Sequence, residues 1–336
     1  MPGINNDMNK PKVSVVIVNW NTRDMLRDCL ESVFAQTQLI PIQVIVIDNG
    51  SADDSCAMVR EQFTQVELIE NSSNMGFAKA MNQGVEASSG EYVLMLNSDT
   101  LIRDGAIEKV VRFADNCPEA AIIGCRLLNP DGTFQESCFR FPNLLGLFFS
   151  TVYLSQVFKH NFIFNWDRYG FREWTVPTKV DCVEGSFMLI RRSVLENIGL
   201  LDTGYFMYGE ETDLSYRVKM AGWEVVYYPV AEVFHVRGGS SKGWAGRAWA
   251  YQSCQRGVLL FLCKWHHPAV AYLGNLIITI FLIPRLVAWW LMDVVSSLFQ
   301  RQGFSWRRIK QGTSFWFHVR AIFRPKLLHQ KWSRDT

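Results

Sequence analysis

Short apolar runs alternate with stretches of helical periodicity in the first part of the chain. The runs are rich in β-branched residues and lie at residues 13–18, 44–48, 66–69 and 92–96. The helical stretches between them lie at about 22–34, 53–63 and 77–87. Continuous apolar strands that alternate with helices are typical of a parallel sheet covered on both faces. The pattern predicts an α/β domain with a doubly wound, mainly parallel sheet.

The chain departs from this alternation after residue 99. Further strands are indicated at residues 119–141, 187–190 and 225–228. A helix is expected at residues 213–221, where Gly222 ends it. Residues 144–174 are aromatic and apolar without a clear period, which indicates an insertion.

Polar residues follow three of the expected strands. These strand ends carry Asn19 and Trp20, then Asp48, then Asn97 and Asp99. Ligands of open α/β sheets bind beyond the carboxyl ends of the strands. The coincidence of three polar strand ends therefore predicts a binding site at that edge of the sheet.

Asp99, Asp48 and Trp20 each allow a functional and a structural interpretation. Asp99 can bind Mg²⁺ or Mn²⁺ that bridges substrate phosphates, because hard oxygen ligands suit these cations; otherwise it caps a helix or turn. Asp48 can accept hydrogen bonds from a nucleoside; otherwise it forms an Asx turn. Trp20 can stack on a base or belong to the core.

Residues 71–84 place Asn74 and Gly76 directly before a helix. Free N–H groups at a helix start can bind an anionic phosphate, so we expect this segment to contact a phosphorylated ligand. The sequence has neither a G-x-G-x-x-G fingerprint nor a G-K-[ST] phosphate loop. A dinucleotide fingerprint and a P-loop are therefore excluded.

Three carboxylates, those of Glu210, Glu211 and Asp213, cluster at the start of the later helix. The helix dipole favours acids there, which is the structural interpretation of Asp213. Repulsion among the three raises the pKa of at least one, and a raised pKa suits a general base that deprotonates a hydroxyl. His235 precedes the Gly-rich residues 237–241 and is either a metal ligand or a structural histidine.

Charge is unevenly distributed along the chain. The net charge of +2 combines +8 over residues 301–336, which hold nine Lys or Arg and one Asp, with −6 over residues 1–300, which hold 25 basic and 31 acidic residues. A nucleic-acid-binding protein usually carries its basic residues on the folded domain, so we expect no nucleic-acid partner. A basic tail beside an apolar segment indicates an anionic membrane surface.

The eight cysteines and the N-terminus bear on the cellular compartment. The cysteines form no C-x-x-C pair and have no zinc-type spacing with histidine. The polar N-terminal residues lack the apolar core of a signal peptide. We therefore expect a reduced, cytosolic folded domain.

Taken in order, these segments resemble family 2 glycosyltransferases with the GT-A fold, in particular the bacterial rhamnosyltransferase-like branch. The matching strings over residues 12–241 are VSVVIVNWN, VIVIDNGSADDS, NMGFAKAMNQG, EYVLMLNSDT, EGSFMLIRRSVLENIGLLD, FMYGEETDLSYR and FHVRGGSS. The resemblance implies a nucleotide-sugar donor, a divalent cation and inverting transfer to a hydroxyl of a saccharide acceptor. It suggests L-rhamnose from dTDP-rhamnose, with UDP-sugars as competitors, and a polyprenyl-diphosphate-linked acceptor in cell-surface polysaccharide synthesis, such as that of O-antigen.

The resemblance also implies a role for each matching residue. Asp99 and His235 would bind the metal, Glu211 would be the catalytic base, and Gly185 would lie beside the donor sugar or the acceptor. The remaining donor-binding residues would be Asn19, Trp20, Asp48, Asn74, Gly76, Lys79, Asn82 and Asn97. Two departures from the family pattern affect these roles. Asn97 replaces the first Asp of a DXD motif, and Glu211 stands where Asp is usual, so the base can also be Glu210 or Asp213.

Residues 268–299 form a candidate membrane-associating segment. The apolar stretch 268–284 has 17 residues, the lower limit for a span, and charged residues interrupt the remainder of the segment. One crossing would separate the basic tail from a catalytic domain that uses cytosolic donors. We expect a re-entrant hairpin bent near Pro284, or an interfacial helix with Trp289, Trp290 and Trp306 at headgroup depth. A helical subdomain of a soluble cytoplasmic protein is the alternative.

The expected organisation has four parts: a flexible terminus at 1–11, a GT-A catalytic domain at 12–245, a helical membrane-associating segment at 246–300 and a basic tail at 301–336. Within the domain, residues 144–174 would be an acceptor-side insertion. The protein would act at the cytoplasmic face of the inner or plasma membrane. Two alternative functions stay open, a polyprenyl-phosphate glycosyltransferase and a catalytically inactive GT-A scaffold.

Overall fold

The computed structural model of the chain describes residues 10–152, 154–158, 160–169, 172–236, 243–281, 283 and 318–321. These residues form two compact units. The first unit draws its described residues from within 1–141 and 173–240, and the second from within 142–172 and 241–332.

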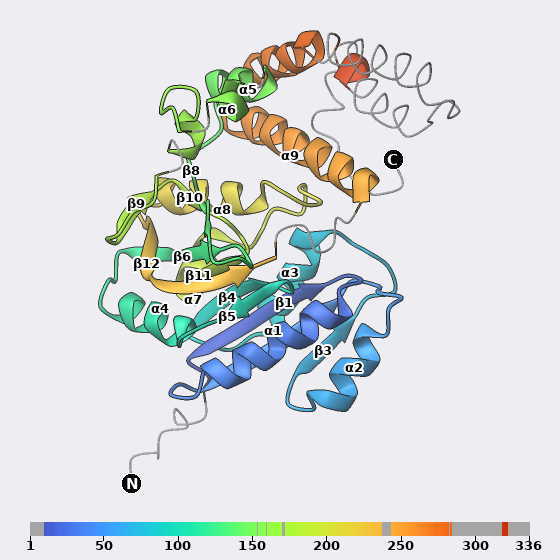
Figure 1. Ribbon diagram of the computed structural model, residues 1–336, viewed down its shortest axis with the longest axis vertical. Coiled ribbons are helices and arrows are strands. Elements are labelled where there is room, and N and C mark those ends of the chain that lie inside the picture. The colour runs from blue at the N-terminus through green and yellow to red at the C-terminus, as the bar shows by residue number, and fades with distance from the viewer. Residues whose placement is uncertain are drawn as a thin grey trace. The chain divides into compact units, whose positions relative to one another are not determined.

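A mixed sheet with flanking helices makes up the first unit (Figure 1). In chain order its elements are β1 Val13–Asn19, α1 Arg23–Gln36, β2 Ile42–Asp48, α2 Ser55–Gln62, β3 Glu67–Glu70, α3 Phe77–Ala87, β4 Tyr92–Asn97, β5 Thr100–Ile102, α4 Ala106–Asp115, β6 Ala120–Leu128, β7 Phe134–Gln135, β8 Cys138–Phe139, β9 Thr178–Val180, β10 Cys182–Val183, β11 Phe187–Arg191, α7 Arg192–Ile198, α8 Glu210–Met220 and β12 Glu224–His235.

The main path of the sheet runs β3-β2-β1-β4-β11-β6-β12-β5. Strands β3, β2, β1 and β4 are parallel, as the alternation of apolar runs and helices predicts. Strand β11 then pairs antiparallel with both β4 and β6, and β5 pairs antiparallel with β12. Strands β6 and β12 pair parallel, so the expectation of parallel pairing is correct for the N-terminal half and for this pair, whereas the sheet as a whole is mixed. The order of strands in space is set by long-range pairing, which the period of an apolar run does not encode.

Helices α1, α2 and α4 pack on one face of this sheet. Their buried residues form one cluster with alternate residues of β1, among them Val13, Val15 and Ile17. Helix α3 covers the opposite face, where Gly84 lies so close to Val16 and Ile47 that a Cβ would fall 2.3–2.4 Å from their side chains. The close contact of α3 with the sheet therefore requires glycine at residue 84.

Two element boundaries differ from the sequence-based expectation. Helix α8 begins at Glu210, three residues before the expected start, so all three acids lie in its first turn. The strand expected at residues 225–228 is part of a longer strand, β12, that continues to His235. Its pairing register with β6 shifts between Tyr228 and Glu232, and this irregularity accommodates Pro229 within a strand.

The second unit is helical. It contains α5 Leu144–Thr151, α6 Leu154–Val157, the 3₁₀ helix η2 Trp166–Arg168, α9 Gly243–Trp265 and a helix over residues 268–281. Leu147 of α5 shares a buried cluster with Leu259 and Leu262 of α9 and with Ile278. Residues 142–172 therefore pack with the C-terminal helices in one compact unit, because the apolar side of α5 is buried against those helices. The catalytic domain expected at 12–245 stays a prediction.

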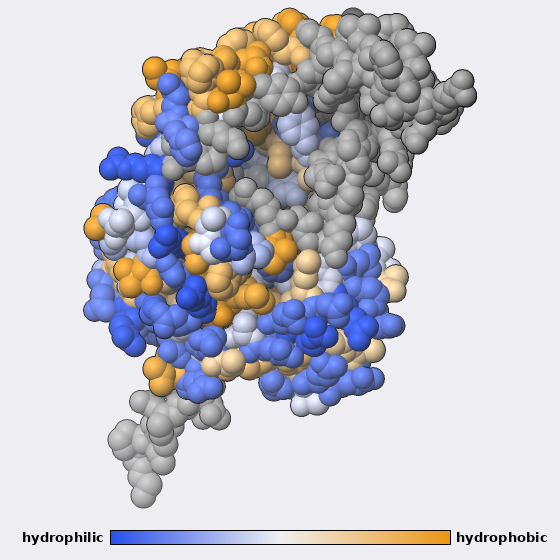
Figure 2. Space-filling view, viewed as in Figure 1, coloured by the Kyte–Doolittle hydropathy of each residue, from blue (hydrophilic) through white to orange (hydrophobic). Residues whose placement is uncertain are grey.

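Exposed apolar side chains are concentrated in this second unit. Of the 15 large apolar side chains that are exposed among the described residues, 11 belong to it. Figure 2 shows such side chains gathered over the part of this unit that holds α5 and the helix at residues 268–281. Among residues 157–166, the exposed large apolar side chains are Val157, Phe158, Phe162, Ile163 and Trp166.

The C-terminal expectations are tested only in part. No helix among the described residues is both long enough and apolar enough to cross a membrane. The bend near Pro284, the aromatic anchors Trp289, Trp290 and Trp306, and most of the basic tail lie outside the described residues. The same is true of the Gly-rich residues 237–241 and of nearly all the N-terminal segment 1–11.

Candidate functional site

A hydrogen-bond network joins the carboxyl ends of β1, β2 and β4. The Asn19 amide Nδ2 donates to Asp48 Oδ1 at 2.9 Å and to Ser51 Oγ at 3.1 Å. Thr22 Oγ1 donates to Asn19 Oδ1 at 2.6 Å and also contacts Ser98 Oγ at 2.8 Å. The three strands end side by side because Asn19 pairs with Asp48 in the β1–β2 register. The predicted edge of the sheet therefore carries one connected polar layer.

Asp48 and Asn19 are both buried within this polar layer. The Asp48 carboxylate also accepts the N–H of Ser51, three residues on, at 2.8 Å and is 2% exposed, so it stabilises the turn that follows β2. Asn19 is 0% exposed and its amide is bonded on both sides. We therefore revise the role of Asn19 from direct ligand contact to positioning of Asp48. Trp20 is half-buried at the same strand end.

Three N–H groups at the entry to α3 are bonded within the protein. The N–H of Met75 donates to Asn49 Oδ1, that of Gly76 to Asn74 Oδ1, and that of Phe77 to the Phe206 carbonyl. These three groups are engaged in this conformation, and the phosphate contact expected for this segment stays a prediction. Asn74 forms an Asx turn that caps the segment, and such a turn competes with an external anion for the same donors.

Two side chains of α3 from the expected donor set differ in their surroundings. The Asn82 amide donates to and accepts from the backbone of Leu201, at 2.8 and 3.1 Å, and so holds α3 to the segment before α8. Lys79 is exposed on the first turn of α3. Its ammonium group is therefore accessible to a charged ligand, whereas Asn82 is engaged within the protein.

Antiparallel pairing of β5 with β12 brings Asp99 and His235 together. His235 is aligned with Thr100, and the Val236 N–H donates to the Asp99 carbonyl at 2.9 Å. As a result the Asp99 Oδ1 lies 3.3 Å from His235 Nε2, and Glu184 Oε1 lies 3.8 Å from His235 Nδ1. His235 is 3% exposed. Residues separated by more than 130 positions thus meet through one strand pair.

The Asp99–His235 pair fits a divalent cation. Two cis ligands at metal–ligand distances near 2.1 Å lie about 3 Å apart, close to the 3.3 Å between Oδ1 and Nε2. No group of three or more His, Cys, Asp or Glu side chains with metal-binding geometry is found among the described residues. Substrate phosphates and water commonly complete the shell of Mg²⁺, so a two-ligand protein site suits such a cation.

Glu184 is a site residue that sequence reasoning missed. It lies between β10 and β11, next to Gly185, and its charge acts on both His235 and Glu211. The string EGSFMLI contains it, but only Gly185 was expected to take part. A carboxylate preceding a Gly-Ser turn is a sequence signal that could have identified it. A Cβ placed on Gly185 would lie 3.6 Å from that of Glu211, so the two residues are adjacent.

A tight turn before α8 sets the orientation of Glu211. Tyr208 and Gly209 both have positive φ, 70° and 102°. The turn allows Glu211 Oε2 to accept the Gly209 N–H at 3.0 Å. A non-glycine residue in the left-handed region costs free energy and is most common at functional sites. The backbone strain at Tyr208 therefore marks this turn as a constrained part of the site.

The three acids of α8 have distinct environments. Asp213 forms an ion pair with Arg217 at 3.0 Å, and Arg217 also donates to the carbonyls of residues 198–200 that follow α7. Asp213 thus has the structural role that the helix start allows. Glu210 is 5% exposed, and its Oε2 has no hydrogen-bond partner among the residues that the structure describes. Glu211 is half-buried and hydrogen-bonded.

Burial controls the protonation of the adjacent pair Glu210 and Glu211. Burial, together with the charge of Glu211, raises the pKa of Glu210 well above its ordinary range. Burial also raises the pKa of Glu211, and the nearby charge of Glu184 raises it further, while the Gly209 N–H opposes the shift. The more buried Glu210 therefore favours the neutral form. Glu211 is left as the carboxylate of the pair that can exchange a proton with a ligand.

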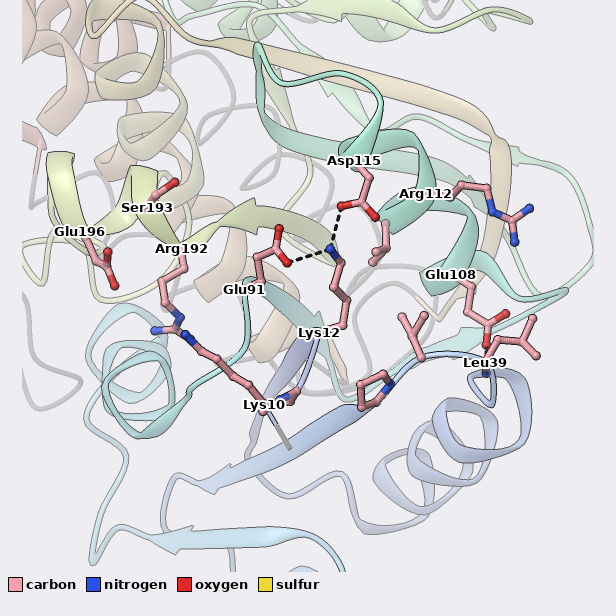
Figure 3. A pocket seen from close by; sticks show the side chains of 14 residues that line it. Lys10, Lys12, Leu39, Glu91, Glu108, Arg112, Asp115, Arg192, Ser193 and Glu196 are labelled. Atoms are coloured by element: carbon pink, nitrogen blue, oxygen red, sulfur yellow. Dashed lines mark hydrogen bonds and ion pairs between the residues drawn. The ribbon is translucent and has the colours of Figure 1, made fainter. Parts of the chain in front are cut away.

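A large hollow in the first unit lies away from these residues. Figure 3 shows its lining side chains at the amino ends of β1 and β4. Its volume is about 860 Å³. The side chain of Lys12 there is paired with Glu91 and Asp115, at 2.7 and 2.9 Å. The hollow is at the opposite edge from the polar strand ends, so its size does not make it the candidate site.

Comparison with known proteins was made by sequence and by structure. Residues 11–252 match the family described as glycosyltransferase like family 2. N-acetylglucosaminyl-diphospho-decaprenol L-rhamnosyltransferase of Mycobacterium tuberculosis is 30% identical over 234 residues, 66% of this chain and 75% of that protein. The O-antigen biosynthesis protein RfbC of Myxococcus xanthus is 26% identical over 236 residues, 67% of this chain but 17% of that protein.

Solved structures show the same fold. The mannosyltransferase PcManGT of Pyrobaculum calidifontis, in complex with GDP-Man and Mn²⁺, has a TM-score of 0.54 at 15% identity and covers 95% of this chain and 89% of that one. GalNAc-T7 with UDP, GalNAc and Mn²⁺ has the same score and identity and covers 77% of this chain and 49% of that one. The likeness establishes a GT-A-like α/β fold with a mixed central sheet.

Proposed function

The chain belongs to glycosyltransferase family 2, and from this we propose that it is an inverting, cation-dependent enzyme. It transfers a sugar from a nucleotide-diphosphate donor to a hydroxyl of a saccharide acceptor. The observation that carries the proposal is the meeting of Asp99, His235, Glu184 and Glu211 at one edge of the sheet. A single in-line displacement needs two parts: a pair of protein ligands that holds the cation, and a carboxylate that acts as the base.

Asp99 and His235 hold the cation, Mg²⁺ or Mn²⁺, in this proposal. When bound, the cation neutralises charge on the diphosphate leaving group. Asp48 accepts hydrogen bonds from the nucleoside, and Asn19 and Ser51 fix its carboxylate for that purpose. Trp20 and Lys79 contribute a stacking surface and a positive charge to the donor. Asn97, at the end of β4, and Asn74 and Gly76, before α3, shape the rest of the donor pocket.

Glu211 is the catalytic base of this mechanism. Its pKa is raised by burial and by Glu184, so it takes a proton from an acceptor hydroxyl more readily than an exposed glutamate does. Asp213 is held by Arg217, and Glu210 is deeper and favours the neutral form. The proton moves from the hydroxyl to the Glu211 carboxylate as the oxygen attacks the anomeric carbon. The bond to the diphosphate breaks on the opposite side, which inverts the configuration.

The relatives suggest the substrates. The Mycobacterium tuberculosis protein is named as an L-rhamnosyltransferase that acts on N-acetylglucosaminyl-diphospho-decaprenol. By this likeness we propose L-rhamnose from dTDP-rhamnose as the donated sugar and a polyprenyl-diphosphate-linked saccharide as the acceptor. The relative RfbC is named for O-antigen biosynthesis, which supports a role in cell-surface polysaccharide synthesis.

A lipid-linked acceptor requires access to a membrane, and the second unit is suited to provide it. Its exposed residues Phe158, Phe162, Ile163 and Trp166 combine large apolar and aromatic side chains, the types that enter the interfacial region of a bilayer. We place this unit at the cytoplasmic face of the inner membrane, in monotopic or re-entrant attachment. The full chain should co-sediment with phosphatidylglycerol vesicles, and F162S/I163S should weaken binding at least ~10-fold. The matched pair L39S/V230S, exposed in the first unit, should leave it unchanged.

Donor turnover tests the transferase itself. Wild-type protein is incubated with a panel of dTDP-, UDP- and GDP-sugars in the presence of Mg²⁺ or Mn²⁺, and release of the nucleoside diphosphate is measured. We expect release with one donor class and a loss of at least ~10³-fold in Asp99→Ala, because the leaving group loses its counter-charge. Absence of release with every donor, or release unaffected by Asp99→Ala, contradicts the mechanism.

A further inference from the structure

The side chain of Gln135 lies directly behind His235. Gln135 is on β7, which pairs with β6, and β6 in turn pairs with β12, the strand that ends at His235. The Gln135 Oε1 is 2.7 Å from His235 Nδ1, and Gln135 Nε2 donates to the His235 carbonyl at 3.1 Å. Both side chains are buried. One amide group therefore contacts the ring and the backbone of the same histidine.

The orientation of the Gln135 amide is fixed by its neighbours. Its Nε2 faces two acceptors, the His235 carbonyl and Asn129 Oδ1 at 2.7 Å. The Asn129 amide is itself oriented, because its Nδ2 donates to Thr133 Oγ1, whose own proton goes to Asp131. Turning the Gln135 amide over would place oxygen against a backbone carbonyl. Oxygen must therefore face the imidazole ring.

This orientation determines which nitrogen of His235 carries the proton. Gln135 Oε1 is an acceptor, so Nδ1 must donate, and the carboxylate of Glu184 on the same side favours the same arrangement. In the neutral ring Nε2 then has a lone pair, and it points toward Asp99 Oδ1 at 3.3 Å. Two electron-rich atoms facing each other at this distance are held together most favourably by a cation between them.

We propose that Gln135 is a positioning residue that holds His235 in its Nδ1–H tautomer, so that Nε2 and Asp99 present a ready-made pair of ligands to a divalent cation. In the opposite tautomer the Nε2–H would donate to Asp99 and occupy both ligands at once. The Asp131–Thr133–Asn129 chain keeps Gln135 oriented. The turn at residues 129–133, far from His235 in the chain, thereby orients the metal ligands before the donor binds.

The inference rests on the proposed metal site of the transferase but not on the identity of donor or acceptor. A histidine that ligates a metal usually donates its other ring N–H to an acceptor, and removal of such a partner lowers metal affinity about 10–100-fold. Gln135→Met keeps the volume and removes the acceptor. Gln135→Glu keeps an acceptor for Nδ1–H, and Ser137→Ala removes a buried polar group nearby that does not contact the ring.

The experiment combines two measurements on the full chain. Ring ¹⁵N shifts of labelled histidine, with His235 assigned by His235→Gln among the six histidines, should show a protonated Nδ1 and an unprotonated Nε2. Titration with Mn²⁺ alone, followed by the paramagnetic signal of the free ion, should show ~10–100-fold weaker binding in Gln135→Met. Gln135→Glu should bind Mn²⁺ more tightly than Gln135→Met, because it keeps the acceptor for Nδ1–H although it loses the donor to the His235 carbonyl, and Ser137→Ala should equal wild type.

The outcomes separate this inference from the proposed function. A protonated Nε2 in the wild-type protein, or equal Mn²⁺ affinity in wild type and Gln135→Met, overturns the role of Gln135 even if the enzyme transfers sugar. Conversely, the expected tautomer and the expected loss of Mn²⁺ affinity uphold it even if no donor is turned over. The wild-type tautomer is measured without Gln135→Met, so a folding defect in that variant does not remove the test.

Discussion

The sheet edge that carries the candidate site has two halves, and they differ in how their polar groups are paired. At the ends of β1 and β2, Asn19, Asp48 and Ser51 form a closed network in which donors and acceptors match. At the ends of β4 and β12, the carboxylates of Asp99 and Glu184 flank the imidazole of His235. Glu210 and Glu211 lie at the start of α8, where the charge of Glu184 acts on Glu211. The first half is held by hydrogen bonds within the folded chain, whereas the second brings carboxylates close to one another, where protonation or a bound cation lowers their repulsion.

This contrast suggests a division of labour. A saturated network holds its shape whatever is bound, so it suits recognition of an invariant group such as a nucleoside. A cluster of buried acids has protonation states that respond to charge, so it suits the steps in which charge moves. Binding of the donor and chemistry at the sugar are thus assigned to separate halves of one edge. Substitutions in the two halves should therefore affect different kinetic parameters.

The largest effect is expected for Glu211→Gln in the acidic half. The variant removes the base but keeps the shape, so kcat should fall about 10²–10⁴-fold with little change in the donor KM. In the wild type the base is active when deprotonated. Because the pKa of Glu211 is raised, kcat should decline on acidification at a pH above the ordinary range of glutamate. Initial rates from pH 5 to pH 9 test both statements.

The alternative acceptor chemistry gives a different result for the same variant. If the nucleophile were a polyprenyl phosphate, already ionised, a base would be dispensable and Glu211→Gln would barely reduce turnover. Glu211→Asp serves as the matched control, because it keeps the carboxylate and shortens the side chain by one methylene. It should retain more activity than Glu211→Gln if the carboxylate acts as the base.

A smaller effect is expected for Asn19→Ala in the saturated half. The substitution removes one buried hydrogen-bond partner from Asp48 and one from Thr22, which should cost about 1–3 kcal/mol of unfolding free energy and raise the donor KM more than it lowers kcat. Urea denaturation and donor titration measure the two effects. Asn116→Ala, at the exposed end of α4, is the control and should change stability by less than ~0.5 kcal/mol. A kcat defect without a change in KM would contradict the division between the halves.

The saturated half could be predicted from the sequence more fully than the acidic half. Residues Asn19 and Asp48 stand at the ends of regular apolar strands, and parallel strands bring their carboxyl ends to one edge. Local pattern therefore located these positions. It did not show that Asn19 is buried beneath Asp48, because burial depth depends on how α1 and the loop with Ser51 close over the strand end.

The acidic half depends on contacts that no local pattern contains. Glu184 and Gln135 reach His235 through short strands of two to five residues, whose pairing is set by the whole sheet. The antiparallel insertion of β11 between β4 and β6 likewise results from long-range packing. At α3 the sequence correctly placed the helix but not the partners of its N–H groups. Asn49 and Phe206, which accept two of them, lie far from it in the chain.

The smallest effect concerns stability in the acidic half and distinguishes the two halves without any substrate. The pKa of Glu210 is raised in the folded protein, so the folded state binds its proton more tightly than the unfolded chain does. Its contribution to stability is present below the unfolded-state pKa and is lost as the pH rises through the folded-state pKa. Glu210→Gln mimics the neutral form, so it should stabilise the protein by roughly 1 kcal/mol at pH 8, with the gain shrinking toward zero near pH 4. Thermal denaturation at both pH values measures this gain in unfolding free energy. The control Glu86→Gln, at an exposed residue, should show none. A stability difference that does not depend on pH would instead place Glu210 in the saturated network.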